Sequence, residues 1–89
     1  MELATQTWTV ELVLSERDGV THAEARLRSG LPTPLVATGE ARLSPRDPVD
    51  VAEIGYELAA ARALTRLGRQ LLLAADSDVD ALLQESDRG

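Results

Sequence analysis

Three segments in the first half of the chain alternate apolar and polar residues, and this period of two constrains the fold most strongly. Residues 7–14 (TWTVELVL), 22–28 (HAEARLR) and 35–43 (LVATGEARL) each present one apolar and one polar side, as half-buried β-strands do. The segments SERDGV and SGLPTP between them have the composition of turns and loops. The first half of the chain therefore predicts a three-stranded antiparallel meander with one polar face.

The second half changes to a helical period. The prolines of SPRDPVD, residues 44–50, end the sheet, and Asp50 with Glu53 has the spacing of an N-capping pair. We expect one long helix over residues 51–75, then a short acidic helix over residues 78–85 capped by Ser77 and Asp80. The predicted fold is α+β, a two-layer βββαα sandwich. It divides into an N-terminal tail (1–6), the folded domain (7–75) and an acidic C-terminal helix and tail (76–89).

The apolar residues of the long helix cover well over half of its circumference at about 100° per residue. This arc comprises Ile54, Leu58, Ala61, Leu64, Leu67, Gly68, Leu71 and Leu72. One face of a sheet covers only about half of a helix. The excess indicates a second covering surface, either the terminal segment or another subunit; alternatively, alanines such as Ala60 and Ala63 tolerate water.

Glu57 lies inside this apolar arc, where a buried carboxylate would need a partner. Either the first turns extend past the edge of the sheet and leave Glu53 and Glu57 in water, or Glu57 pairs with an arginine across an interface. Glycines 55 and 68 each cost about 1 kcal/mol relative to alanine inside a helix, which close backbone packing would explain.

Length and composition favour a small domain reinforced by a partner. Eighty-nine residues form one domain with a thin core, and exposed sheet edges invite pairing with another chain, so we expect a homodimer. There is no cysteine, which excludes disulfides and thiolate chemistry. No apolar run approaches the about 20 residues of a membrane helix, and MELATQTW is unlike a signal peptide. We expect a cytoplasmic protein without membrane contact.

Charge is concentrated at two places in the chain. The net charge is −6, yet the last fourteen residues hold five acids and one arginine, so the rest of the chain is close to neutral. Arg62, Arg66 and Arg69 line one side of the helix. Three interpretations of this strip stay open: a solvated helix face, a face neutralised by acids of the tail or of a partner, and a phosphate-binding face.

The predicted polar face of the sheet has its own arginines. Arg26, Arg28 and Arg42 share this face with Glu24 and Glu40, so cross-strand ion pairs are an alternative to a basic surface. If the protein binds phosphate groups or a charged partner, we expect these three arginines or the helix strip to make the contacts. Only Trp8 and Tyr56 are aromatic, so no platform for stacking single-stranded bases is available.

Catalytic and metal-binding patterns are absent from the sequence. His22 is the only histidine, no GxSxG elbow accompanies the serines, and the glycines form no phosphate-binding loop. The aspartates of DSDVD alternate as in a calcium-binding loop, but Ala81 and Asp87 stand where that loop needs glycine and glutamate. We expect no catalytic residue, metal, cofactor or small-molecule substrate.

Two blocks of the sequence carry a resemblance to a known family. TWTVELVLSERDGVTHAEARLR and EIGYELAAARALTRLG, with LSPRDP before the second block, resemble a bacterial family of about ninety-residue domains of unknown function with a double-stranded-RNA-binding-domain-like fold. The match spans residues 7–72. The matching positions are Trp8, Arg26, Arg28, Arg42, Glu53, Gly55, Glu57, Arg62 and Gly68.

The resemblance implies a three-stranded sheet with a long helix, homodimers that exchange elements, and induction of some members under dormancy or low oxygen. Members are similar in shape to ribosome hibernation-promoting factors. Two functions follow as expectations. The first is a non-enzymatic regulator linked to stress or dormancy and associated with the ribosome or structured RNA. The alternative is a homodimeric protein-interaction module that binds no nucleic acid.

Overall fold

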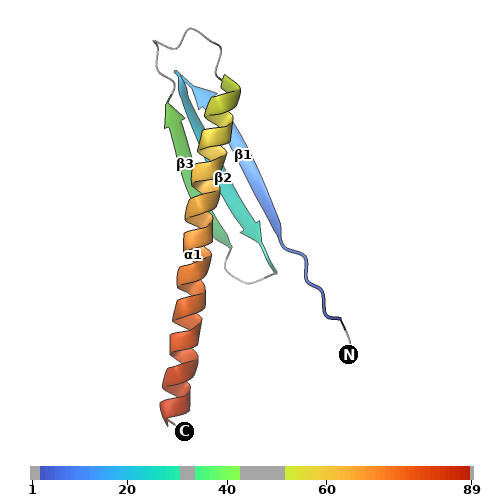
Figure 1. The fold of residues 1–89 in the computed structure, drawn as a ribbon, viewed down its shortest axis with the longest axis vertical. Helices are drawn as coiled ribbons and strands as arrows, with labels where there is room; N and C mark the ends of the chain where they lie inside the picture. Colours follow the sequence, from blue (N-terminus) through green and yellow to red (C-terminus); the bar gives the residue numbers. More distant parts are fainter. Residues whose placement is uncertain (1–2, 31–33, 43–51, 89) are drawn as a thin grey trace.

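The computed structural model describes residues 3–30, 34–42 and 52–88, which form three strands and one helix (Figure 1). The strands are β1 (Thr9–Arg17), β2 (Val20–Arg28) and β3 (Leu35–Arg42), and the helix is α1 (Ala52–Arg88). The strands form an antiparallel sheet in the order β1-β2-β3, and α1 packs on one face. The predicted α+β architecture of a meander on a long helix is confirmed.

The turn between β1 and β2 is tighter than the sequence predicted. The two strands pair up to Arg17 and Val20, so only Asp18 and Gly19 remain in the loop. Both have positive φ, 53° and 75°, as a two-residue hairpin with an Asp-Gly loop requires. The expected six-residue turn is therefore wrong at both ends, because the Asp-Gly pair reverses the chain by itself.

The helix packs on the sheet through small residues. Gly55, Ala59, Ala63 and Leu67 recur every four residues and are buried, whereas Ile54, Leu58, Leu64 and Leu72 of the predicted apolar arc are exposed. The reason lies at Gly39 of β3: a Cβ there would lie 2.5 Å from the backbone oxygen of Ala59 and 2.5 Å from the backbone nitrogen of Ala63. At such a close approach only small side chains fit between helix and strand.

The predicted short C-terminal helix is not formed, because α1 continues without a break to Arg88. Ser77 and Asp80 have capping spacing but lie within the helix. No glycine or proline occurs between Gly68 and Gly89, so nothing in this segment stops helix propagation. Residues 72–88 extend past the end of the sheet (Figure 1).

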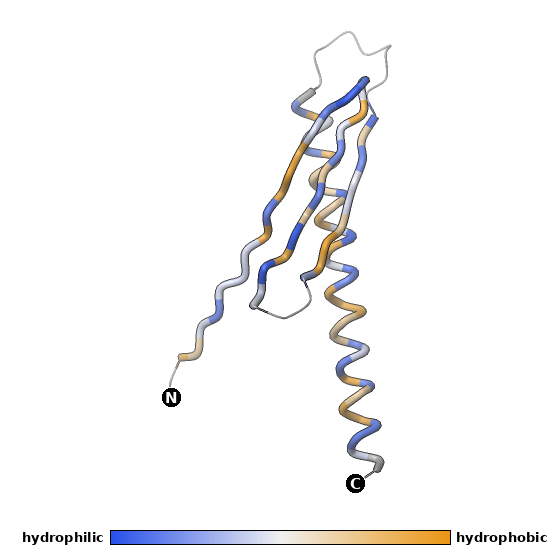
Figure 2. Tube along the Cα trace, turned by 180° about the vertical axis from the view of Figure 1, so that it is seen from behind, coloured by the Kyte–Doolittle hydropathy of each residue, from blue (hydrophilic) through white to orange (hydrophobic). Residues whose placement is uncertain are grey.

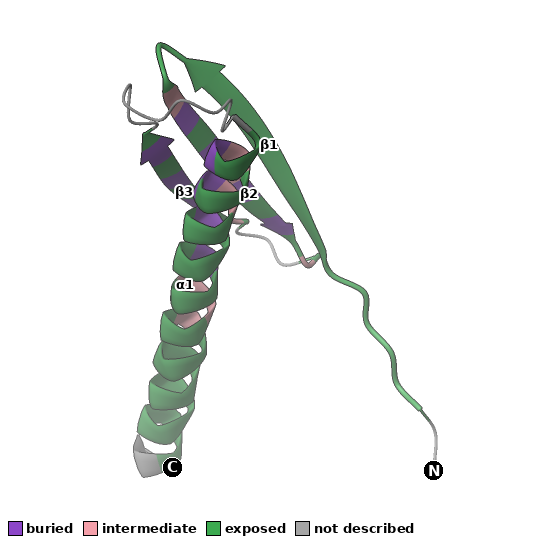
Figure 3. Ribbon diagram, turned by 45° about the horizontal axis from the view of Figure 1, so that its top comes forward, coloured by how far each residue is buried: buried purple, intermediate pink, exposed green. Residues whose placement is uncertain are grey.

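The sheet is covered unevenly. Ala23, Ala25 and Leu27 of β2 are buried under α1, but every residue of β1 is exposed, as Figure 3 shows. In the register, Leu12 lies opposite Ala25 and Val10 opposite Leu27, so their side chains share the face that α1 occupies. The helix contacts β2 and β3 and barely reaches β1.

Some expectations concern parts of the chain outside the described residues. These are the capping role of Asp50, the loop at residues 44–50, and the end of the third strand at Leu43. Glu53 does lie in the first turn of α1, where the helix dipole favours an acid. Within the described ranges, α1 is not apolar enough over any stretch to cross a membrane.

Candidate functional site

The outer face of the sheet, which points away from α1, carries charged residues that pair with one another. Arg28 of β2 donates a hydrogen bond of 3.3 Å to the Glu11 carboxylate of β1, and Arg26 donates one of 2.8 Å to Glu24 of the same strand. The hydrogen bond that Arg26 donates to Glu24, and then the charge of that carboxylate, raise the pKa of Arg26 above its ordinary value. Two of the arginines that the sequence indicated as phosphate contacts thus already have carboxylate partners.

A third polar contact lies at the other side of this face. His22 Nδ1 of β2 is 3.3 Å from a carboxylate oxygen of Glu40 on β3. The two residues are direct cross-strand neighbours in the register, as are Glu11 of β1 and Arg26 of β2. The cross-strand pairing that the sequence allowed is present for Arg28, with Glu11 as its partner, whereas Arg26 pairs within its own strand. The outer face is therefore of mixed charge.

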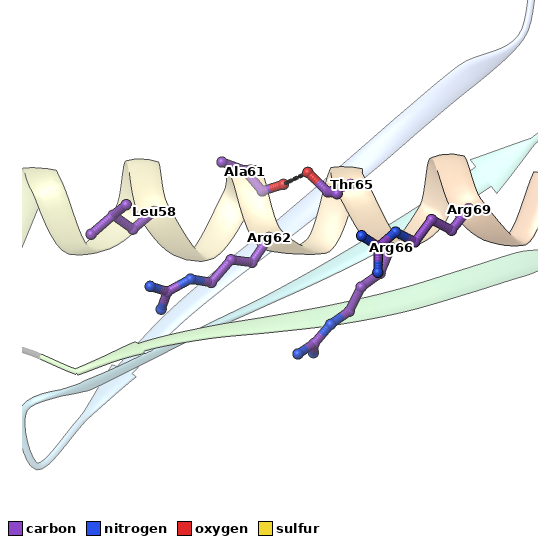
Figure 4. Close-up of a pocket in the computed structure, with 6 residues that line it drawn as sticks. All are labelled: Leu58, Ala61, Arg62, Thr65, Arg66 and Arg69. Atoms are coloured by element: carbon purple, nitrogen blue, oxygen red, sulfur yellow. Dashed lines mark hydrogen bonds between the residues drawn. The ribbon is translucent and has the colours of Figure 1, made fainter.

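The arginine strip of α1 lies along the open edge of β3. Arg62 donates a hydrogen bond of 2.6 Å to the backbone oxygen of Glu40, and Arg66 donates one of 2.8 Å to that of Thr38. Figure 4 shows both side chains leaving the helix toward the strand. The backbone oxygens at the edge of a sheet are the groups to which another strand would bind. Arg62 and Arg66 already donate hydrogen bonds to two of these oxygens on β3.

Arg42 joins this cluster from the end of β3. Together with Arg62, Arg66 and Glu40 it lines an open groove of about 550 Å³. Three guanidinium groups and one carboxylate meet there, so the groove is cationic. The structure thus brings Arg42 next to the helix strip, and it leaves Arg26 and Arg28 paired on the outer face.

Arg69, the last arginine of the strip, lines a shallower hollow of about 220 Å³ on the helix (Figure 4). Leu58, Ala61 and Thr65 contribute its apolar part. Glu57 is exposed, and the described residues contain no group of acids or histidines that could hold a metal ion. Neither hollow is lined by a histidine, and Glu40 is the one carboxylate among the residues that line the two.

Sequence reasoning missed two residues that shape this surface. Glu11, the partner of Arg28, could have been identified because it occupies a polar alternate position on the first strand. Gly39 could not, since its role depends on how closely α1 approaches β3. That approach brings Arg62 and Arg66 within reach of the strand edge.

Large apolar side chains form the other notable part of the surface. Trp8, which precedes β1, and Val10, Leu12 and Leu14 of β1 are between 37% and 47% exposed, and on α1 the exposed fractions reach 68% at Leu73. Figure 2 shows apolar segments recurring along α1 beyond the sheet. A monomeric protein seldom exposes so much apolar surface without a function.

Comparisons with known proteins place this fold among mycobacterial relatives. A model of the Rv2632c-like family matches residues 6–88. The uncharacterized protein Mb1767 of Mycobacterium bovis is 43% identical over 83 residues, which are 93% of this chain and 86% of that protein. The uncharacterized protein Rv2632c of Mycobacterium tuberculosis is 43% identical over 76 residues, covering 85% and 80% of the two chains.

A solved structure has the same fold. The crystal structure of Rv2632c superposes with a TM-score of 0.80 at 43% sequence identity, covering 91% of this chain and 94% of that one. The relatives are described as uncharacterized proteins, with no activity attached.

Proposed function

The chain belongs to the Rv2632c-like family, and from its exposed surfaces we propose that it is a non-enzymatic, homodimeric protein-interaction module of the cytoplasm. The observation that carries this proposal is the uncovered apolar surface of β1 and α1. The inner face of β2 and β3 is buried under the helix, whereas the same face of β1 stays open. An apolar strip that continues a buried core is typical of an interface that a second chain covers.

The paired charges of the outer face also support protein binding over nucleic-acid binding. Phosphate-driven binding relies on cations that are free to neutralise phosphates, and Arg26 and Arg28 are already bonded to Glu24 and Glu11. The C-terminal third of α1 adds Asp76, Asp78 and Asp80, which would repel a nucleic acid.

The mass of the full chain in solution tests this proposal. We expect sedimentation equilibrium at micromolar concentration to give twice the mass of one chain, because burial of the apolar surface drives association. A single-chain mass that persists up to millimolar concentration would contradict the proposal.

The second candidate is a regulator that associates with the ribosome or structured RNA under stress or dormancy, as the likeness to hibernation factors and to a double-stranded-RNA-binding-domain-like fold implies. One observation favours it: the cationic groove formed by Arg42, Arg62 and Arg66. Three guanidinium groups could clamp phosphates of a duplex.

Cosedimentation with ribosomes at low and high salt tests this candidate. Binding through the groove should occur at low salt, disappear at high salt and weaken in Arg42→Gln. Arg17→Gln is the matched control, since Arg17 lies on β1, is separated from Arg42 by β2, does not line the groove, and is well exposed. No comigration at either salt concentration would leave the homodimeric module as the sole candidate.

A further inference from the structure

A continuous stripe of small and apolar residues runs along the side of α1 that faces away from the sheet. Its nine positions are Ile54, Leu58, Ala61, Thr65, Gly68, Leu72, Ala75, Val79 and Leu82. All nine are exposed. The four residues that α1 buries against the sheet belong to a different line, on the opposite side of the helix.

The spacing of the stripe alternates steps of four and three residues without interruption. This average period of 3.5 is that of helices which pack lengthwise against another helix, and here it is sustained for about four heptads. The stripe begins above the sheet and continues through the part of α1 that has no sheet beneath it (Figure 1). Because its length exceeds the sheet, the sheet alone does not explain it.

The order of side-chain sizes along the stripe is nearly the same from both ends. Large residues stand at both ends, Ile54 and Leu58 at one and Val79 and Leu82 at the other, and the middle positions are small except for Leu72. Near the centre is Gly68, whose position has no other atom within 4 Å of an added Cβ. No described residue of the same chain accounts for a glycine there, although it costs about 1 kcal/mol relative to alanine. A close crossing of two helices would account for it.

The charges beside the stripe also differ between its halves. The first half of α1 carries Arg62, Arg66 and Arg69, and the second half carries Asp76, Asp78 and Asp80. Two copies running antiparallel place the arginines of each near the aspartates of the other, whereas parallel copies bring the aspartates together. Helix dipoles favour the antiparallel arrangement as well.

We infer that the stripe binds the same stripe of a second copy, with the two α1 helices antiparallel and crossing near Gly68. This inference rests on the proposed homodimer and specifies its interface. Ile54 then faces Leu82 of the second copy, and Leu58 faces Val79 of the second copy. The part of each helix that lacks a sheet is covered by the sheet-bound half of the other helix, and the two sheets lie on the outside.

Cysteine cross-linking tests this arrangement cleanly, because the chain contains no cysteine. Leu58→Cys and Val79→Cys are prepared as full-length chains; both positions are exposed within one chain, so the fold should tolerate them, and circular dichroism verifies it. The two variants, one carrying an affinity tag, are mixed, allowed to exchange subunits and oxidised with diamide. Val13→Cys, on the exposed outer face of β1, is the matched control.

The antiparallel interface predicts disulfides between Leu58→Cys and Val79→Cys in the mixture, and almost none when either variant or the control is oxidised alone. Self-linked dimers of Leu58→Cys and of Val79→Cys would show a parallel pair and overturn the inference. A dimer in sedimentation without any of these disulfides would place the interface elsewhere, for example on β1, and overturn the inference while the proposed function stands. A monomer in sedimentation would overturn both.

Discussion

The two halves of α1 differ in which side chains they carry and in how many of these are buried. Residues 52–71 place glycine, alanine and one leucine against the sheet, and these residues are buried. Residues 72–86 include large apolar side chains that are almost unburied, although the helix is continuous. The contrast teaches that the small residues serve a backbone contact made within one chain, whereas the large ones have no such contact among the described residues and are available to the proposed dimer.

The contact at Gly39 should give the largest effect, because it holds the first half of α1 on the sheet. In Gly39→Val the new side chain meets the backbone of Ala59 and Ala63, and a backbone cannot move aside as a side chain can. We expect urea titrations to show no cooperative unfolding transition. Thr38→Val, on the exposed face of the same strand, is the control and should unfold like the parent; equal behaviour of the two variants would refute the close approach.

Truncating a leucine in each half of α1 sharpens the comparison. Leu67→Ala removes a side chain that is 3% exposed and should lower the free energy of unfolding by about 3 kcal/mol. Leu73→Ala removes one that is 68% exposed and lies off the stripe, so its effect should stay within about 0.5 kcal/mol. The comparison fails if the two losses are similar at one fixed protein concentration.

Introducing a glutamate at one position in the second half of α1 tests whether the stripe itself, and not the surface beside it, forms the dimer interface. Leu82 and Leu73 are almost equally exposed, at 66% and 68%, but only Leu82 belongs to the stripe. We expect Leu82→Glu to weaken dimerisation at least about tenfold, or about 1.4 kcal/mol, because a carboxylate would enter an apolar interface. Leu73→Glu should dimerise like the parent in sedimentation equilibrium. An equal loss in both variants would mean that general charge repulsion, not the stripe, is responsible.

The smallest effect concerns the arginine strip on the first half of α1. Arg66→Ala removes the hydrogen bond to the backbone oxygen of Thr38 and should lower the free energy of unfolding by about 0.5–1 kcal/mol. Arg69, from the same strip, lines the hollow on the helix, and Arg69→Ala should change the free energy of unfolding less. Chemical denaturation distinguishes them, and a larger loss in Arg69→Ala would contradict the proposed role of the edge contact.

The sequence predicted the sheet better than it predicted the helix. The alternation of apolar and polar residues in β2 and β3 can be read from the order of residues along the chain. These strands begin and end within two residues of their expected limits. The burial of α1 depends on how closely two backbones approach. Large residues such as Ile54 and Leu58 were therefore predicted to form the core. The buried residues are instead Ala59 and Ala63, which pack closely against Gly39.

The C-terminal half of α1 and the arginines show the same limit. The capping spacing at Ser77 predicted the start of a new helix. Ser77 instead lies inside α1, where the backbone needs no capping residue. The candidate site was predicted in part: the sequence identified Arg42, Arg62 and Arg66, but only the fold shows that they meet at the edge of β3. Cross-strand ion pairs were foreseen as an alternative, but Arg26 pairs with Glu24 of its own strand, and the cross-strand pair is the one between Arg28 and Glu11.

Hydrogen exchange of residues 72–83 at several protein concentrations tests most directly whether a second copy supports the half of α1 that lacks a sheet. A helical segment of this length without tertiary contacts frays rapidly, so the account predicts slow exchange at high concentration and fast exchange when dilution separates the chains. Exchange in the sheet-bound residues 55–67 should change far less. Exchange of residues 72–83 that is independent of concentration would contradict the account.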